Sequence, residues 1–303
     1  MSVARAQAII NGVTVNLTKN TSSGKWEATA TAPQNSSYNQ SGHYYGVTIK
    51  AWDEAGNLTT KDVTDATLGA ALKLVVKERT APVITITYPT AGATIINNKP
   101  VITWKVTDND SGVDPATIGV TIDSGSKVTG NSIVKTAISG GYQCSYTPGT
   151  ALSDGGHTIK MDASDYDGNA AAQKSVTFKV DTVPPTLSIS GPTDGFITNN
   201  ASCTVSGTTN DSTSSPCKVT VKLNSGSAEA VTVGADGSFL KAITLAQGSN
   251  TIIITSTDSA GKSTTVTRNV ILDTTAPVVN SVVLTPNPVN TSAAFTISVE
   301  ISD

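Results

Sequence analysis

Three segments of the chain alternate apolar and polar residues and then stop at an aspartate that a glycine follows three residues later. A two-residue period places every second side chain on one face of a β-strand. The aspartate can accept backbone hydrogen bonds in a tight turn, and the glycine can adopt positive φ. Each segment therefore predicts a strand with one core face, ending in a turn. The predicted core positions are Val47, Ile49 and Ala51, then Ile159, Met161 and Ala163, then Ile252, Ile254 and Ser256.

The turns end at Gly56, Gly168 and Gly261, so the pattern recurs about every 100 residues, the size of one small domain. Many short strands separated by turns, with no helical period of useful length, predict an all-β fold of tandem two-sheet Greek-key sandwiches arranged as an elongated rod. Trp104 is predicted to be buried in one of these cores. The other predicted strands are 83–88, 101–107, 118–122, 175–180, 203–207, 218–223, 239–245 and 264–272.

Proline-containing segments divide the repeats. They lie at 79–82, 181–185 and 273–277, each after a predicted strand and before a new alternating run. Proline fixes φ and favours extended geometry in its predecessor, so these segments predict short, semi-stiff linkers. We therefore expect domain 1 at 1–78, domain 2 at 79–180, domain 3 at 181–272, and at 273–303 the start of a fourth domain. Two strands cannot close a sandwich, so the fourth domain is expected to be truncated.

Composition narrows the possible partners. Charged residues make up 14% of the chain and the formal net charge is −3, so no basic footprint for nucleic acid is expected. No stretch approaches the roughly 18 apolar residues of a membrane span. The N-terminus has no export signal pattern, which leaves cytoplasmic synthesis or prior removal of a signal. The three cysteines favour free buried thiols, with a Cys203–Cys217 bridge as the alternative.

Domains 2 and 3 resemble bacterial immunoglobulin-like (Ig-like) domains. The residues that carry the resemblance are the Thr-Val-Pro-Pro and Thr-Ala-Pro linkers, Gly237–Phe239, Gly248–Thr251 and Asp258–Gly261, with 155–158 and 165–169 as the counterparts in domain 2. The resemblance implies the sandwich fold. It says little about function, because such modules occur in adhesins, secreted enzymes and phage particles.

Domain 1 lacks the proline linker and carries a different resemblance. Its stretches 8–17 and 24–30 resemble the first domain of Ig-like proteins that are encoded in tail-gene clusters of phages infecting Gram-positive bacteria.

Nothing in the sequence indicates an enzyme. It contains two histidines, and His157 occupies a strand position that Asn250 and Tyr45 fill in the other repeats. No catalytic, phosphate-binding or zinc-binding motif is present. We therefore expect a non-enzymatic module with no required cofactor.

Clustered aspartates make calcium a possible ligand, since Ca²⁺ takes six to eight oxygen ligands from closely spaced carboxylates and carbonyls. Resemblance to giant Ig-like adhesins implies calcium at the joints between domains. The alternative is that these are turn residues on a mildly acidic surface. The candidate ligands are Asp108, Asp110, Asp162, Asp165, Asp167 and, at the joints, Asp181 and Asp273.

A second candidate site is the aromatic group of domain 1, which contains Trp26, Tyr38, Tyr44, Tyr45 and Trp52. Trp26, Tyr44, Tyr45 and Trp52 could stack on sugars or anchor a protein, and Trp52 falls on the outward phase of its strand. The alternative is that they cover a sheet face or the joint with domain 2.

Two functions remain open. The first is a phage virion component of the tail, fibre or decoration, present in several copies and contacting other virion proteins or bacterial surface glycans. The missing export signal and the resemblance of domain 1 favour it. The second is a secreted surface adhesin, or an accessory region of a cell-wall or glycan-active enzyme, located outside the cell or on its surface.

Overall fold

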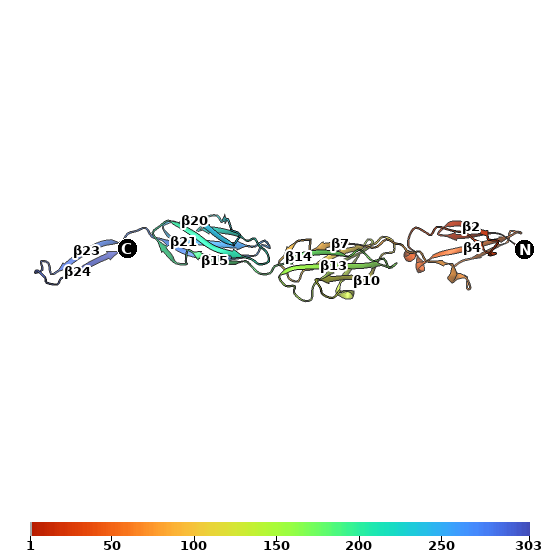
Figure 1. Ribbon diagram of the computed structural model, residues 1–303, viewed down its shortest axis with the longest axis horizontal. Coiled ribbons are helices and arrows are strands. Elements are labelled where there is room, and N and C mark those ends of the chain that lie inside the picture. Colours follow the sequence, from red (N-terminus) through yellow and green to blue (C-terminus); the bar gives the residue numbers. More distant parts are fainter. Residues whose placement is uncertain (1) are drawn as a thin grey trace. The chain divides into compact units, whose positions relative to one another are not determined.

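A computed structural model describes residues 2–303 as strands, turns and short 3-10 helices (Figure 1). The chain forms two compact units, one ending at Val180 and the other beginning at Asp181. Among the described residues, no helix is long and apolar enough to cross a membrane. The predicted all-β fold of tandem Ig-like domains is confirmed, while the four domain boundaries stay predictions.

Domain 1 is built on one six-stranded sheet in the order β3-β2-β1-β4-β5, with β6 pairing β4. Its strands are β1 (Val3–Ile10), β2 (Val13–Lys19), β3 (Trp26–Glu27), β4 (Tyr45–Asp53), β5 (Leu58–Lys61) and β6 (Lys73–Leu74), and its 3-10 helices are η1 (Ser37–Asn39), η2 (Ser41–His43) and η3 (Gly69–Leu72). The buried apolar residues of this domain are Ala6, Ala8 and Tyr45. Domain 1 therefore differs from the predicted two-sheet sandwich: its strands form a single sheet, and two alanines and one tyrosine give it a thin core.

Domain 2 has the expected two sheets, in the orders β10-β13-β14-β8 and β11-β12-β9-β7. Its elements are β7 (Val83–Tyr88), β8 (Thr94–Ile95), β9 (Ile102–Thr107), β10 (Val113–Ile122), η4 (Gly130–Ser132), β11 (Val134–Ile138), β12 (Gly141–Tyr146), β13 (Gly155–Asp165) and β14 (Lys174–Val180). Trp104 on β9 has no exposed surface and belongs to one core cluster with Met161 on β13. The two sheets therefore close around a common core, and the prediction for Trp104 is confirmed.

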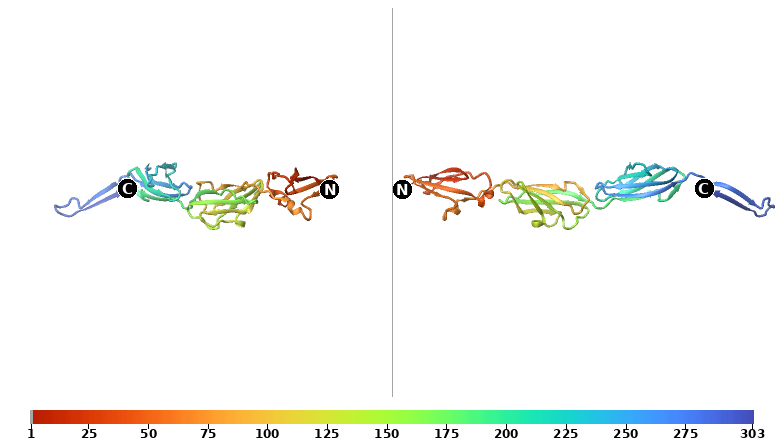
Figure 2. Two further views of the ribbon diagram at one scale, coloured as in Figure 1. Left: turned by 45° about the vertical axis from the view of Figure 1, so that its right-hand side comes forward. Right: turned by 180° about the vertical axis from the view of Figure 1, so that it is seen from behind.

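Domain 3 repeats this plan with sheets β15-β17-β20 and β16-β22-β21-β18-β19. Figure 2 shows its strands from two further directions, in the colours of residues 181–272. Its strands are β15 (Thr186–Gly191), β16 (Phe196–Thr198), β17 (Ser202–Asn210), β18 (Lys218–Leu223), β19 (Glu229–Val231), β20 (Ser238–Thr244), β21 (Gly248–Thr257) and β22 (Ser263–Leu272). Val205 and Ile254, one from each sheet, are fully buried in its core. Residues 273–303 add the antiparallel pair β23 (Val278–Thr285) and β24 (Thr296–Ser302).

The repeated aspartate turns have the predicted geometry. Oδ1 of Asp53, Asp165 and Asp258 accepts the backbone N–H of the residue four positions later, at 2.9, 2.7 and 2.9 Å. The glycines that follow have φ of 84°, 93° and 92°. The turns join β4 to β5, β13 to β14 and β21 to β22 as antiparallel hairpins.

Ile49, Met161 and Ile254 are the predicted core positions four residues before the turn aspartate, and two of the three are fully buried. Met161 and Ile254 have no exposed surface, whereas Ile49 is only half-buried. The reason is that β4 belongs to a single sheet, so no second sheet faces it within domain 1. The three cysteines are free and buried, as expected, and burial raises the pKa of the Cys144 thiol to about 11.

Truncating Ile254 to Ala should destabilise domain 3 by about 2–5 kcal/mol, because it removes a fully buried side chain between two sheets. Leu240→Ala is the matched control, since Leu240 is 71% exposed and its loss should change the free energy of unfolding by less than about 0.5 kcal/mol. Chemical denaturation of both variants measures the two changes in the free energy of unfolding. Equal changes would contradict the burial of Ile254 between the two sheets of domain 3.

Candidate functional site

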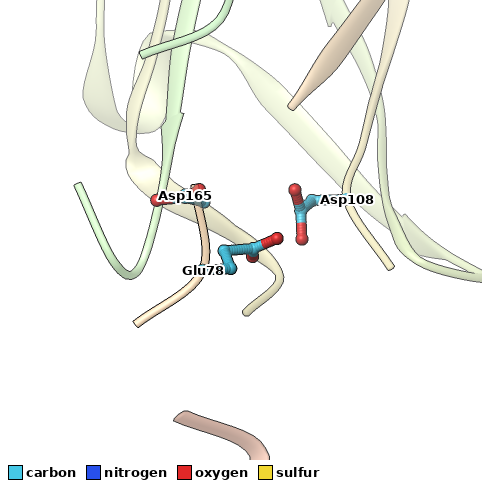
Figure 3. Close-up of side chains that lie close together, drawn as sticks. All are labelled: Glu78, Asp108 and Asp165. Atoms are coloured by element: carbon cyan, nitrogen blue, oxygen red, sulfur yellow. The ribbon is translucent and has the colours of Figure 1, made fainter. Parts of the chain in front are cut away.

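Two groups of three carboxylates come together at the ends of domains 2 and 3. The first, the Glu78 cluster, contains Glu78, Asp108 and Asp165; the second, the Asp181 cluster, contains Asp181, Asp211 and Asp258. Within each cluster one oxygen from every residue lies within 4.8 Å of the other two. Figure 3 shows the Glu78 side chain directed toward Asp108, with Asp165 beside them on the β13–β14 hairpin.

The two clusters occupy the same three places in the fold. The first carboxylate lies at the start of the linker, since Glu78 directly precedes residues 79–82 and Asp181 is the first of residues 181–185. The second directly follows the second long strand, β9 or β17. The third is the turn aspartate that ends β13 or directly follows β21. The linker and strand residues are 30 positions apart in both cases, from 78 to 108 and from 181 to 211. The ladders also share one register, with Val83 opposite Thr107 and Thr186 opposite Asn210. The clusters are therefore equivalent features of the two domains.

Backbone amides hold the Glu78 cluster in place. Asp108 Oδ1 accepts the N–H groups of Asp110 and Gly112 at 3.0 and 2.9 Å, and Glu78 Oε1 accepts the N–H of Ser111 at 2.6 Å. Burial raises the pKa of Glu78, and the nearby Asp108 and Asp110 carboxylates add to this, against the lowering effect of the Ser111 hydrogen bond.

The side chain of Asn169 donates hydrogen bonds to two residues of the Glu78 cluster. Its Nδ2 donates to Asp165 Oδ2 at 2.7 Å and to the backbone oxygen of Glu78 at 3.3 Å. Both oxygens of Asp165 therefore have protein donors, since Oδ1 accepts the Asn169 N–H.

The Asp181 cluster is more deeply buried and less satisfied. Asp181 is 0% exposed, Asp211 8% and Asp258 5%. Each Oδ1 accepts a backbone N–H, from Val183 at 3.3 Å, from Ser214 at 2.6 Å and from Lys262 at 2.9 Å. The second oxygens of Asp181 and Asp258 are buried and have no hydrogen-bond partner, and neither has the Ser214 hydroxyl.

Buried carboxylates without donors are costly, because burial removes the water that stabilises their charge and neighbouring like charges add repulsion. A bound divalent cation would relieve both effects. All the available donors are oxygens, which suits Ca²⁺ or Mg²⁺ rather than zinc. The arrangement can thus bind a hard cation between a linker and the domain that follows it.

The structure brings together only some of the predicted metal ligands. Asp108, Asp165 and Asp181 belong to the clusters. Asp110 accepts the Ser36 N–H at 2.9 and 3.0 Å, and Asp167 accepts the Glu78 N–H at 3.0 Å. Both therefore connect domain 1 or its linker to domain 2.

Two predicted ligands lie outside the clusters altogether. Asp162 pairs with Gln173 at 2.9 Å and Lys127 at 3.7 Å, on the sheet surface. Asp273 is exposed and accepts the Thr275 N–H at 3.0 Å.

Sequence reasoning missed Glu78, Asp211 and Asp258. Two signals in the sequence could have identified them: the constant 30-residue spacing from linker to strand end, and the position of Asp258 in the repeated turn motif. Glu78 was overlooked because it precedes the proline linker by one residue, and Asp211 because no second aspartate flanks it.

The four predicted aromatic residues have different surroundings. The Arg5 guanidinium lies 3.8 Å above the ring of Trp52, and the Lys73 ammonium lies 4.8 Å from that of Tyr44. Tyr45 is buried and donates its hydroxyl to the Asn35 carbonyl at 3.2 Å, while Trp26 is half-buried on β3. A role for these four residues in binding stays a prediction.

Tyr38, the fifth member of the predicted aromatic group, belongs to an aromatic stack beside the Glu78 cluster. Tyr38 stacks on Tyr166 at a ring-centroid distance of 4.1 Å and on His43 at 4.3 Å. Because Tyr38 belongs to η1 and Tyr166 follows Asp165, this contact joins domain 1 to domain 2.

His157 is a buried structural residue, as its place in the repeat suggested. Its Nδ1 lies 2.8 Å from Asp123 Oδ2 and its Nε2 lies 2.8 Å from the Ser153 carbonyl. In domain 3 Asn250 takes its place and Asn224 that of Asp123, joined by a 3.0 Å hydrogen bond. A neutral amide pair thus replaces an ionisable one.

Comparisons with known proteins agree with this fold. Residues 82–161 match the family model described as a bacterial Ig domain, and residues 185–274 match that of glucodextranase domain B. A 135-residue stretch is 31% identical to Bacillopeptidase F of Bacillus subtilis (strain 168), which is 45% of this chain but 9% of that protein.

Solved structures with tandem modules are also similar. The fibronectin(III)-like modules of Clostridium thermocellum CbhA match at 17% identity, covering 63% of this chain and 94% of that one, with a TM-score of 0.34. A tetra-tandem repeat from the extending region of a large adhesion protein matches at 19% identity, covering 98% and 79%, also with a TM-score of 0.34. The family matches and the two-sheet folds together define residues 82–161 and 185–274 as belonging to two tandem bacterial Ig-like domains.

The stability of domain 2 should depend on the protonation of His157. Burial alone lowers the pKa of this imidazole, but the Ser153 carbonyl and the Asp123 carboxylate outweigh that effect, so its pKa is raised above the ordinary value. The stabilisation is therefore complete below pH about 6.5 and is lost as pH rises through the raised pKa.

Nuclear magnetic resonance can measure this pKa directly, since the chain has two histidines and His157→Asn identifies the second signal. Thermal unfolding at pH 5.5 and 8.5 should show a loss at the higher pH in the wild type that His157→Asn abolishes. An unshifted or lowered pKa would contradict the expectation.

Proposed function

We propose that this chain is a non-catalytic accessory region, a row of Ig-like domains in which Ca²⁺ fastens linkers to the domains that follow them. The observation that carries the proposal is the pair of buried oxygens of Asp181 and Asp258 that have no hydrogen-bond partner. Ionised carboxylates in such a place require a compensating positive charge or a proton. A cation supplies that charge and joins a linker residue to a turn residue.

The donors favour Ca²⁺ over other metal ions. Calcium accepts irregular sets of carboxylate, carbonyl, hydroxyl and water oxygens, whereas Mg²⁺ demands a near-ideal octahedron and retains most of its water. Asp181, Asp211 and Asp258 offer three carboxylates and Ser214 a hydroxyl oxygen. Backbone carbonyls and water would complete the coordination.

A linker fixed by a cation restricts the motion between neighbouring domains. Such a restriction suits an accessory region that holds other domains of a protein at a distance from one another. The similarity to a small fraction of the much longer Bacillopeptidase F supports an accessory region within a larger secreted or surface protein. In such a protein, bacterial surface glycans are the partners expected of an adhesive module.

The second candidate is a phage virion component, which the resemblance of domain 1 to tail-associated Ig-like proteins favours. Its partners would be other virion proteins or bacterial surface glycans, and its many copies would give avidity. Mass spectrometry of purified particles and of the secreted fraction distinguishes the two: detection only in the secreted fraction excludes the virion function.

Calcium should stabilise domain 3 through the Asp181 cluster. Binding to the folded state alone adds about 2.7 kcal/mol at a free Ca²⁺ concentration 100 times Kd. Asp258→Asn should remove this gain while keeping an oxygen that accepts the Lys262 N–H. Glu229→Gln is the control, since it removes the same charge from a residue whose side chain is 64% exposed.

Thermal unfolding with CaCl₂, with EDTA and with NaCl of equal ionic strength measures the effect. An increase in Tm that NaCl reproduces, or that Asp258→Asn retains, would reject calcium binding at this cluster.

A further inference from the structure

The two acidic clusters differ at one position. Four residues after the turn aspartate, domain 2 has Asn169 and domain 3 has Lys262. Both backbone N–H groups bind Oδ1 of the turn aspartate, so the turns are alike. The side chains differ: Asn169 donates to Asp165 Oδ2 at 2.7 Å, while the corresponding oxygen of Asp258 is buried and has no partner.

The side-chain amide of Asn169 stabilises the Asp165 carboxylate by donating a hydrogen bond to Oδ2, the oxygen that a cation would otherwise contact. It connects the turn carboxylate to the linker, because the same Nδ2 lies 3.3 Å from the Glu78 carbonyl. A cation at Asp165 Oδ2 would have to displace this donor, and would gain less because the oxygen is already satisfied. Domain 1 supports this function of the residue, since Asn57 Nδ2 binds Asp53 Oδ2 at 2.8 Å in the same turn.

The linker of domain 2 also has other attachments. Asp167 accepts the Glu78 N–H at 3.0 Å, and Lys77 donates to the Asp167 carbonyl at 3.1 Å. The Glu78 cluster is thus held by protein hydrogen bonds on several sides. The Asp181 cluster instead has two buried carboxylate oxygens without a partner, Oδ2 of Asp181 and Oδ2 of Asp258. The serine hydroxyls of Ser111 and Ser214 are buried without a partner in both domains, so the carboxylate oxygens alone distinguish the two clusters.

We propose that the residue four positions after the turn aspartate determines which cluster binds a cation: Asn169 closes the Glu78 cluster, and Lys262 leaves the Asp181 cluster open to one Ca²⁺. This proposal rests on the proposed function and adds to it a stoichiometry and a specificity-determining position. In domain 2 the side-chain amide of Asn169 joins the turn aspartate to Glu78. In domain 3 a Ca²⁺ ion joins the turn aspartate to Asp181.

Isothermal titration calorimetry of the full 303-residue chain with CaCl₂ tests the proposal. The wild type should bind one Ca²⁺. Asp258→Asn should abolish binding, and Asp165→Asn should leave it unchanged. Asn169→Ala should add a second binding event, because it frees Asp165 Oδ2, and Asn169→Leu, which is close in size to asparagine, should do the same.

Two substitutions at position 262 form a matched pair of variants. Lys262→Asn and Lys262→Ala remove the same charge, but only asparagine can donate to Asp258 Oδ2. Lys262→Asn should weaken Ca²⁺ binding about tenfold or more, the usual effect of altering a group that contacts a ligand, while Lys262→Ala should retain binding. Circular dichroism and thermal unfolding confirm that each variant is folded.

The failures of the two proposals can be told apart. Two equal binding events in the wild type, no second event in either Asn169 variant, or equal affinities in the two Lys262 variants would overturn this inference and leave calcium fastening intact. No binding by the wild type would overturn both.

Discussion

The register between the first and second long strands of each domain is the constraint on which the acidic clusters depend. It places the residue after the linker proline opposite the residue that precedes the second carboxylate, as in Val83–Thr107 and Thr186–Asn210. Because one face of each strand is buried, a slip of one residue would turn the core face outward. The core thus fixes a linker carboxylate beside a strand-end carboxylate, and the hairpin turn supplies the third.

The same register recurs at the end of the chain. Val278 pairs with Ser302, so Asp273 and Asp303 take the linker and strand-end places, again 30 positions apart. Both residues are exposed in this two-stranded segment. In domains 2 and 3, where two sheets close around a core, the counterparts Asp108, Asp181 and Asp211 are buried and Glu78 is half-buried.

Among its described residues, domain 1 contains the aspartate turn without an acidic cluster. Asp53 makes the same turn hydrogen bonds as Asp165 and Asp258, but β4 belongs to a single sheet and the turn carboxylate has Asn57 as its side-chain partner. The aspartate turn is therefore a means of ending a strand, for which an acceptor at the first turn position suffices. It becomes a candidate cation site only where a linker residue and a strand-end residue bring a second and a third carboxylate against it.

The sequence by itself determined the strands, the turns and the all-β tandem fold, because period-2 alternation and turn residues act over a few neighbouring positions. It also indicated Asp108, Asp165 and Asp181, since they lie in acidic turns or linkers. The tertiary structure decided that Glu78, Asp211 and Asp258 complete the clusters, that Asp162 does not belong to either, and that domain 1 has one sheet. The physical reason is that these outcomes depend on pairing between strands distant in the sequence and on the packing of two sheets, because β9 and β13, like β17 and β21, lie in different sheets. Local patterns specify neither the pairing nor the packing.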